Sequence, residues 1–82
     1  MFYLYGTSHC HLCDEAEAIL LKIKPVKSIT WEIIDIAHDD TLIALYGLKI
    51  PVLKSIATHK ELCWPFDSVA VELFIANNMH GN

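Results

Sequence analysis

Arginine is absent from the chain, and its six lysines are scattered among 82 residues that include ten acidic side chains. Arginine binds phosphate through two parallel hydrogen bonds, and a nucleic-acid interface needs a continuous basic surface. The formal net charge is −4 at pH 7. We therefore expect no nucleic-acid partner.

Long hydrophobic runs are also missing, although 54% of the residues are hydrophobic. A membrane-spanning helix needs about 20 consecutive apolar residues. The apolar segment at residues 2–5 is too short to be a secretory signal, and it lacks the basic flank of one. We expect no membrane span and a cytoplasmic protein. The hydrophobic residues should instead fill the core of a single small domain, residues 1–82.

Cysteine is scarce, with three copies in the chain. In a reducing compartment such a set favours a metal site or a working redox pair over a permanent disulfide framework. Two residues separate Cys10 from Cys13, whereas Cys63 stands between Leu62 and Trp64 in a short apolar segment. We expect Cys63 to be an inert core thiol.

The first half of the chain predicts a strand, a helix and a second strand. Residues 2–5 are aromatic and apolar, and turn residues follow at 6–8. Residues 15–24 place apolar side chains at helical spacing, with Cys13 at the start of the helix and Pro25 as its end. Residues 30–36 are largely β-branched and apolar, which predicts a strand buried on both faces and parallel to the first.

The second half predicts a short helix, a hairpin and a last helix. Residues 39–47 carry acidic caps and a terminal glycine, and residues 51–56 and 61–64 predict paired strands. The last helix should begin at Asp67 or Ser68 and end near residue 77, with residues 78–82 as a frayed tail. Its apolar side chains predict a core helix in a monomer, with a weak dimer through this helix as the alternative.

The element order, with the Cys-x-x-Cys pair after the first strand, resembles the thioredoxin superfamily, and the chain resembles its glutaredoxin-like branch. The resemblance rests on Cys10-His11-Leu12-Cys13, on Ile50-Pro51 and on Trp64-Pro65-Phe66-Asp67. It implies an α/β, thioredoxin-like fold, with a four-stranded mixed sheet flanked by three helices in the order βαβαββα. It also implies that Pro51 forms a cis peptide bond and aligns an incoming chain beside the dithiol.

The position of Cys10 at a helix start predicts a reactive thiol. Free backbone N–H groups and the helix dipole favour an anion there, so the thiol becomes a better acid. Cys13, one turn further on, is placed to attack a mixed disulfide formed at Cys10. We assign Cys10 as the nucleophile and Cys13 as the resolving thiol.

The residues around the motif leave the sign of the pKa shift at Cys10 open. Histidines at 9 and 11 favour the thiolate when protonated, whereas the acids at 14 and 15 oppose it. His11 also stands where many relatives have proline. Residues 2–5 contain no buried acid of the kind found in thioredoxins, so proton transfer to Cys13 must involve solvent, a histidine or the substrate.

The leading functional hypothesis is a thiol–disulfide oxidoreductase that exchanges electrons with disulfides of client proteins or of glutathione. We expect no bound cofactor, and glutathione as electron donor follows from the resemblance alone, since Lys49 is the nearest basic side chain. The expected substrate-binding residues are His11, Leu12, Ile50, Pro51, Phe66 and Asp67.

Two alternatives belong to other functional classes. Cys10 and Cys13 could hold zinc together with His9 or His11, or two copies of the chain could share an iron–sulfur cluster with glutathione. A closed zinc site needs four ligands, and the chain has no second Cys-x-x-Cys, so we assign no metal-binding residue. The other alternative is a thioredoxin-fold interaction module whose dithiol is idle. We predict that His38, His59 and His80 lie at the surface, whichever of these functions applies.

Overall fold

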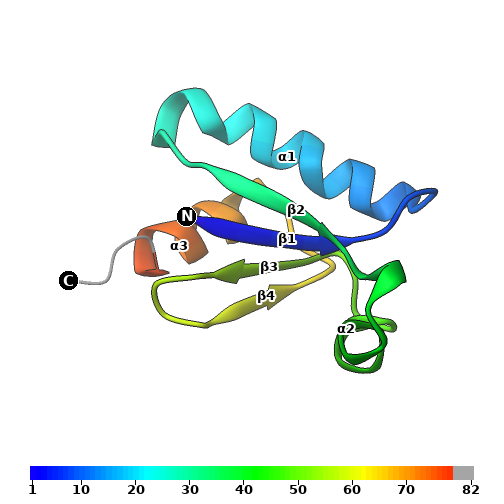
Figure 1. The fold of residues 1–82 in the computed structure, drawn as a ribbon. Helices are drawn as coiled ribbons and strands as arrows, with labels where there is room; N and C mark the ends of the chain where they lie inside the picture. Colours follow the sequence, from blue (N-terminus) through cyan, green and yellow to red (C-terminus); the bar gives the residue numbers. More distant parts are fainter. Residues whose placement is uncertain (79–82) are drawn as a thin grey trace.

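The computed structural model describes residues 1–78, which form four strands, three α-helices and one 3₁₀ turn (Figure 1). In chain order they are β1 Phe2–Gly6, α1 His11–Lys27, β2 Trp31–Asp35, η1 Ile36–His38, α2 Asp40–Tyr46, β3 Val52–Ser55, β4 Glu61–Cys63 and α3 Ser68–Asn78. His38 and His59 are exposed as predicted. His80 and residues 79–82, predicted as a tail, lie outside the described residues.

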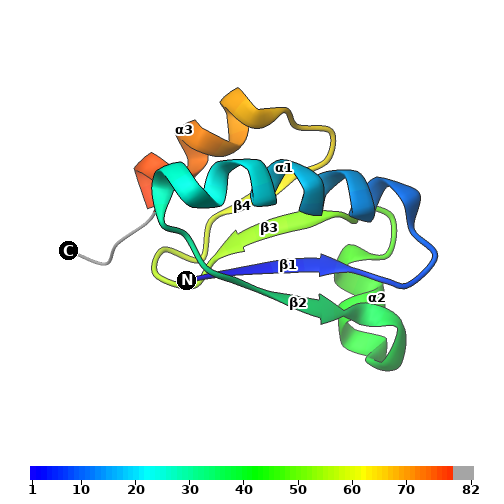
Figure 2. The same ribbon diagram turned by 90° about the horizontal axis from the view of Figure 1, so that it is seen from above.

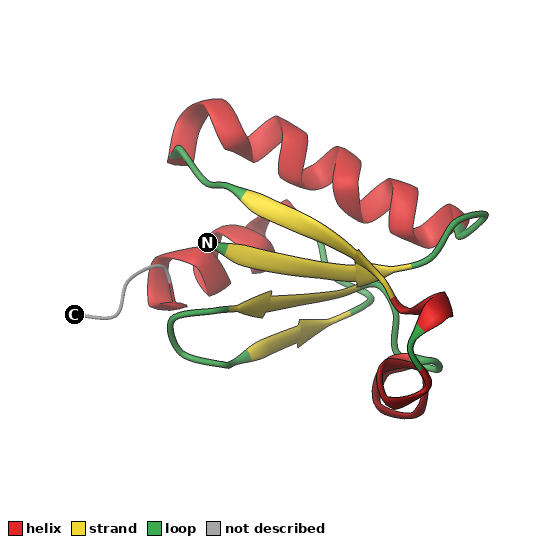
Figure 3. Ribbon diagram, in the orientation of Figure 1, coloured by secondary structure: helices red, strands yellow, loops and turns green. Residues whose placement is uncertain are grey.

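The strands form one mixed sheet in the order β2-β1-β3-β4 (Figure 3). β1 runs parallel to β2, with Leu4 opposite Ile33, and antiparallel to β3, with Leu4 opposite Leu53. β3 and β4 form the predicted antiparallel hairpin. A parallel pair needs a crossover connection, which α1 supplies, so the predicted thioredoxin-like βαβαββα architecture is confirmed.

The helices cover both faces of the sheet and create two apolar clusters. α1 and α3 contact each other and bury Phe2, Leu4 and Leu53 on one face (Figure 2). On the other face, α2 packs through Tyr46 against a smaller cluster that includes Val52. The larger cluster therefore holds the long helix α1 against the centre of the sheet, and with it the Cys-x-x-Cys motif at the start of that helix.

Helix α1 has the predicted apolar stripe but a later end. Ala16, Leu20 and Ile23 are buried. Pro25 lies inside the helix, and the end is set by Ser28, which has a left-handed conformation and donates its N–H to the Lys24 carbonyl at 2.9 Å. Proline lacks the N–H that would complete one helical hydrogen bond. Near the end of a helix that loss is small, so the predicted stop at Pro25 is wrong.

Strand β2 is an edge strand, which corrects the prediction that residues 30–36 are buried on both faces. Glu32 and Ile33 are exposed, Ile33 to 53%. The strand order leaves one side of β2 without a neighbouring strand within the described residues. An apolar sequence can indicate a strand, but the neighbours that cover it are set by the topology of the whole sheet.

Helix α3 is in the core on one face only. Val71 and Ile75 are fully buried, whereas Val69 and Leu73 are 63% and 60% exposed. The prediction of a core helix is therefore right for half of its apolar surface. Within residues 1–78, no helix is long and apolar enough to cross a membrane.

Asn78 is the last residue of α3. The prediction that it belongs to a frayed tail is therefore wrong. Its side chain is buried, and its Oδ1 accepts a hydrogen bond from Thr58 Oγ1 at 2.8 Å. Its carbonyl oxygen accepts a second one from Ser55 Oγ at 2.6 Å. These contacts anchor the end of α3 to the turn between β3 and β4.

Candidate active site

Cys10 is the N-cap of α1, immediately before the first helical residue. It has an extended conformation, and its Sγ accepts a hydrogen bond from the backbone N–H of Cys13 at 3.2 Å. An N-cap side chain normally accepts such a bond through oxygen, and here sulfur takes that place. The first turn of the helix therefore offers hydrogen-bond donors and the positive end of its dipole to Cys10 Sγ.

Cys13 lies in the first turn of α1, where its sulfur is at disulfide bonding distance from that of Cys10, and the two Cα atoms are 5.2 Å apart. Both residues are partly exposed. A Cβ at Gly6 would lie 2.9 Å from Cys13 Sγ, so the end of β1 approaches the sulfur as closely as a residue without a side chain allows. The pair can form and break a disulfide without movement of the backbone.

The Ile50–Pro51 peptide bond is cis, as predicted. Tyr5 of β1 pairs with Val52 of β3, so Gly6 and Pro51 are the next residues along these neighbouring strands. Pro51 is buried. Because Gly6 approaches Cys13, Pro51 lies at the same end of the sheet as Cys13. A second cis bond, Trp64–Pro65, was not predicted; its Trp64 N–H donates to the Pro51 carbonyl at 3.1 Å.

The other predicted substrate-binding residues differ in what they can offer. Leu12 is 42% exposed, and the side chain of His11 is exposed and within 3.2 Å of Glu15. Phe66 is buried in the main cluster against Trp64, so its side chain belongs to the core. Asp67 is exposed, and its Oδ1 accepts the Ala70 N–H at 2.8 Å, which caps α3. Their part in binding stays a prediction.

A family model described as "Glutaredoxin-like domain (DUF836)" matches residues 2–76. The chain belongs to this glutaredoxin-like family. Two structures of bacterial proteins are similar over nearly the whole chain. Protein XcR50 from X. campestris is 31% identical, with a TM-score of 0.85 over 94% of this chain and 97% of that one. Protein Ne2328 from Nitrosomonas europaea is 32% identical, with a TM-score of 0.77 over 89% and 87%.

A more distant similarity is to a thioredoxin. Thioredoxin 1 from Thermosipho africanus is 16% identical, with a TM-score of 0.60 over 93% of this chain and 97% of that one. At this identity the likeness concerns the fold alone. No functionally curated protein shows significant similarity to the chain. A Cys-x-x-Cys pair at disulfide distance in such a fold is consistent with redox function.

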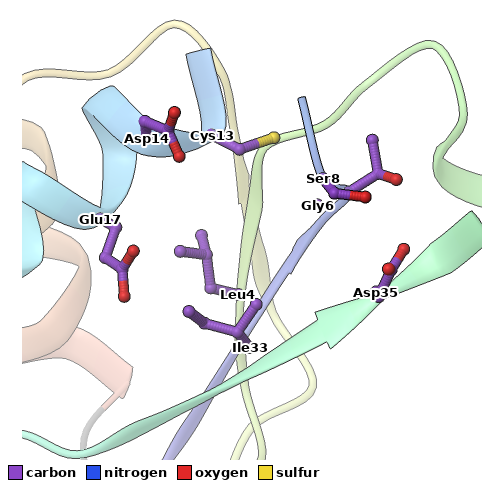
Figure 4. Close-up of a pocket in the computed structure, with 9 residues that line it drawn as sticks. Leu4, Gly6, Ser8, Cys13, Asp14, Glu17, Ile33 and Asp35 are labelled. Carbon is purple, nitrogen blue, oxygen red and sulfur yellow. The ribbon is translucent and has the colours of Figure 1, made fainter. Parts of the chain in front are cut away.

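A pocket of roughly 260 Å³ adjoins the dithiol of this glutaredoxin-like protein on the side of α1 and β2 (Figure 4). Its lining residues are Leu4, Gly6, Thr7, Ser8, Cys13, Asp14, Glu17, Ile33 and Asp35. Among these residues, sequence reasoning gave a site role only to Cys13 and to Asp14, whose charge opposes the Cys10 thiolate. One signal was available, because the carboxyl ends of parallel strands meet at one edge of a sheet, where Asp35 ends β2 beside the motif.

Cys63 is exposed, which contradicts the prediction of an inert core thiol. Leu62 and Trp64 both pack against the main cluster, and side chains alternate between the two faces of a strand. Cys63 therefore points to the opposite face of β4, an edge strand. Within the described residues, no group of three or more His, Cys, Asp or Glu side chains could hold a metal ion.

Proposed function

We propose that this glutaredoxin-like protein is a thiol–disulfide oxidoreductase that exchanges electrons with disulfides of proteins or of glutathione. One observation carries the proposal: the sulfur of Cys10 caps α1 and accepts a backbone N–H, with the sulfur of Cys13 at bonding distance. A helix N-terminus stabilises a thiolate, and the thiolate is the nucleophile of disulfide exchange.

The proposed reaction has two steps and transfers two electrons. The Cys10 thiolate attacks a substrate disulfide, forms a mixed disulfide and releases one substrate thiolate. The Cys13 thiol, after losing its proton, attacks Cys10 Sγ of the mixed disulfide and releases the second substrate thiolate. The protein ends with the Cys10–Cys13 disulfide, and two equivalents of a thiol reductant such as glutathione restore the dithiol.

The substrate is proposed to lie along the strand end that carries Pro51. The cis proline adjoins Gly6 at the strand end next to Cys13, and backbone groups of an extended peptide can pair with such a strand end. Exposed Leu12 and Asp67 are the side chains that such a substrate would meet. Glutathione would find little basic surface, with Lys49 exposed near the proline and a net charge of −4 on the chain.

The experiment compares the wild-type protein with Cys10→Ser and Cys63→Ser in the reduction of a peptide disulfide and of a glutathione mixed disulfide. We expect Cys10→Ser to abolish exchange and Cys63→Ser to keep the wild-type rate, since Cys63 lies on β4 whereas the dithiol belongs to α1. Equal rates for wild type and Cys10→Ser on both substrates would refute the proposal and favour an interaction module. Equal rates on the glutathione substrate alone would remove glutathione as a partner.

A further inference from the structure

The pocket beside the dithiol combines an apolar floor with an acidic rim. Ile33 of β2, which is 53% exposed, supplies the aliphatic surface, and the buried Leu4 at the centre of the sheet also lines the pocket. The carboxylates of Asp14 and Glu17 project from α1, with Asp14 above Leu4 and Glu17 beside it (Figure 4). Asp35 adds a third carboxylate at the end of β2, where its Oδ1 caps the next turn through the Ala37 N–H at 2.8 Å.

The rim has no cationic counterpart in the described part of the chain. Neither a lysine nor a histidine lines the pocket. The adjacent surface between α1 and β2 shows what such a face can hold, because Lys24 extends its ammonium group to 5.6 Å from the centre of the Trp31 ring. Long cationic side chains lay their aliphatic stem on apolar surface and keep the charge near polar groups.

We propose that this pocket binds a lysine or arginine side chain of a client protein, close in sequence to the cysteine that exchanges with Cys10. The aliphatic stem would lie on Ile33, and the charge would meet Asp14 and Glu17. This inference rests on the proposed function, because the pocket shares Cys13 with the exchange reaction. The proposed client is therefore a protein with a lysine or arginine close to one cysteine of its disulfide.

The same charge distribution separates such clients from glutathione. Glutathione carries two carboxylates, which the acidic rim repels, whereas a basic client is attracted both by the rim and by the net charge of −4. Charges that remain partly exposed contribute modestly and are screened by salt. The preference for basic clients should therefore decrease as the salt concentration rises.

The test uses a pair of disulfide-linked peptides that differ at one residue beside the cysteine, lysine in one and norleucine in the other. Norleucine keeps the aliphatic stem without the charge. At low salt we expect the reduced protein to reduce the lysine peptide about fivefold faster in kcat/KM, with loss of most of that ratio in Glu17→Gln. The variant Glu17→Lys should abolish the preference for the lysine peptide, because its ammonium group offsets the carboxylates that remain.

Glu72→Gln is the matched control, because it removes the same charge from the exposed face of α3, outside the pocket. It should keep the wild-type ratio. The use of a ratio between two peptides cancels any general effect of a variant on the dithiol. A ratio near one in the wild type, or a ratio that Glu17→Gln leaves unchanged, would overturn the pocket while leaving the oxidoreductase in place.

A binding measurement separates failure of the pocket from failure of the proposed function. Peptides with serine in place of cysteine cannot exchange, and their affinity for the oxidised protein is measured by NMR titration. We expect tighter binding of the lysine form, with shifts at Glu17 and Ile33. If neither peptide disulfide is reduced but this preference persists, the proposed binding pocket is supported and the proposed oxidoreductase activity is refuted. Equal affinity of the two serine peptides would overturn the pocket.

Discussion

Gly6 is the residue whose lack of a side chain brings the end of β1 against the dithiol. A methyl group there would lie 2.9 Å from Cys13 Sγ and 3.2 Å from Cys13 Cβ. Both separations are shorter than the roughly 3.5–4.0 Å at which nonbonded atoms normally rest. The sulfur of Cys13 would have to move, and the relation between the two sulfurs would change.

Gly6→Ala should therefore slow the second step of exchange, the attack of Cys13 on the mixed disulfide, more than the first. We also expect it to lower the free energy of unfolding by about 1–3 kcal/mol, the usual cost of overpacking. Stopped-flow kinetics with a peptide disulfide resolves the two steps. The rate of Cys10 alkylation in the reduced protein serves as the internal control and should not change. A variant that slows only the attack of Cys10 on the substrate, and not the attack of Cys13, would contradict the role assigned to Gly6.

Tyr46, on the face of the sheet opposite α1, makes the stability of the protein depend on pH. It stacks on Tyr5, with ring centres 4.3 Å apart, and its hydroxyl donates a hydrogen bond to Glu61. Burial, and next the contact with Glu61, raise the pKa of Tyr46 above its usual value near 10; burial also raises the pKa of Tyr5. A raised pKa in the folded state stabilises the protein below the pKa of the unfolded state.

The contribution of these tyrosines to stability should consequently be constant up to about pH 10 and fall as the pH rises further, because the unfolded chain then loses phenolic protons that the folded chain retains. Urea unfolding at a series of pH values measures this. Tyr46→Phe should flatten the alkaline decline and cost about 1 kcal/mol at neutral pH. Glu61→Gln, which keeps an acceptor but removes the charge, should give an intermediate slope, and an unchanged slope in both variants would contradict the explanation.

At the level of elements, local patterns were enough to predict the order and type of the helices and strands. The stripe of Ala16, Leu20 and Ile23 defined α1, and turn residues after β1 located the motif. Pro51 and its cis bond were predictable only through the family resemblance. Residues 30–36 indicated a strand correctly, but its place at the edge of the sheet depends on contacts that no local pattern contains.

Apart from the end of α1, the features that sequence reasoning missed depend on which face a residue occupies or on distant neighbours. Cys63 was placed in the core because the segment is apolar, although alternation along β4 puts it on the opposite face from Leu62. The pocket unites α1 with the ends of two strands, and Glu17 and Ile33 are far apart in the sequence. Asn78 looked like a tail because its hydrogen-bond partner, Thr58, lies in another element.

The anchor at the end of α3 leads to a prediction about stability. Asn78→Ala removes the hydrogen bond from Thr58 and one to the Phe74 carbonyl, 2.9 Å from Asn78 Nδ2. We expect a loss of about 1–2 kcal/mol, because each of these two part-buried hydrogen bonds contributes about 0.5–1.5 kcal/mol. Asn77→Ala is the matched control, since Asn77 is exposed on the same turn. Equal urea midpoints for the two variants would show that the anchor contributes nothing.

At the scale of the whole molecule, the groups proposed for catalysis meet at one end. The start of α1, the end of β1 and the helix α2 lie together there, opposite the N-terminus (Figures 1 and 2). The exposed apolar side chains of α3 include Val69 and Leu73. Stable interfaces bury about 800 Å² on each partner, which a patch of a few side chains does not reach.

We expect the protein to be a monomer at micromolar concentrations, with sedimentation velocity as the measurement. If α3 forms a weak dimer at higher concentration, Leu73→Lys should abolish it and Glu72→Lys should weaken it far less. A stable dimer that Leu73→Lys leaves intact would contradict both the monomer and the alternative through α3.

The central claim, that Cys10 begins the exchange and Cys13 completes it, is tested most directly by mass spectrometry of trapped mixed disulfides. Each variant, Cys13→Ser and Cys10→Ser, is incubated with a disulfide-linked peptide and then acidified. The account predicts a stoichiometric mixed disulfide at position 10 in Cys13→Ser and almost none in Cys10→Ser. Equal trapping in the two variants, or trapping at position 13 alone, would contradict it.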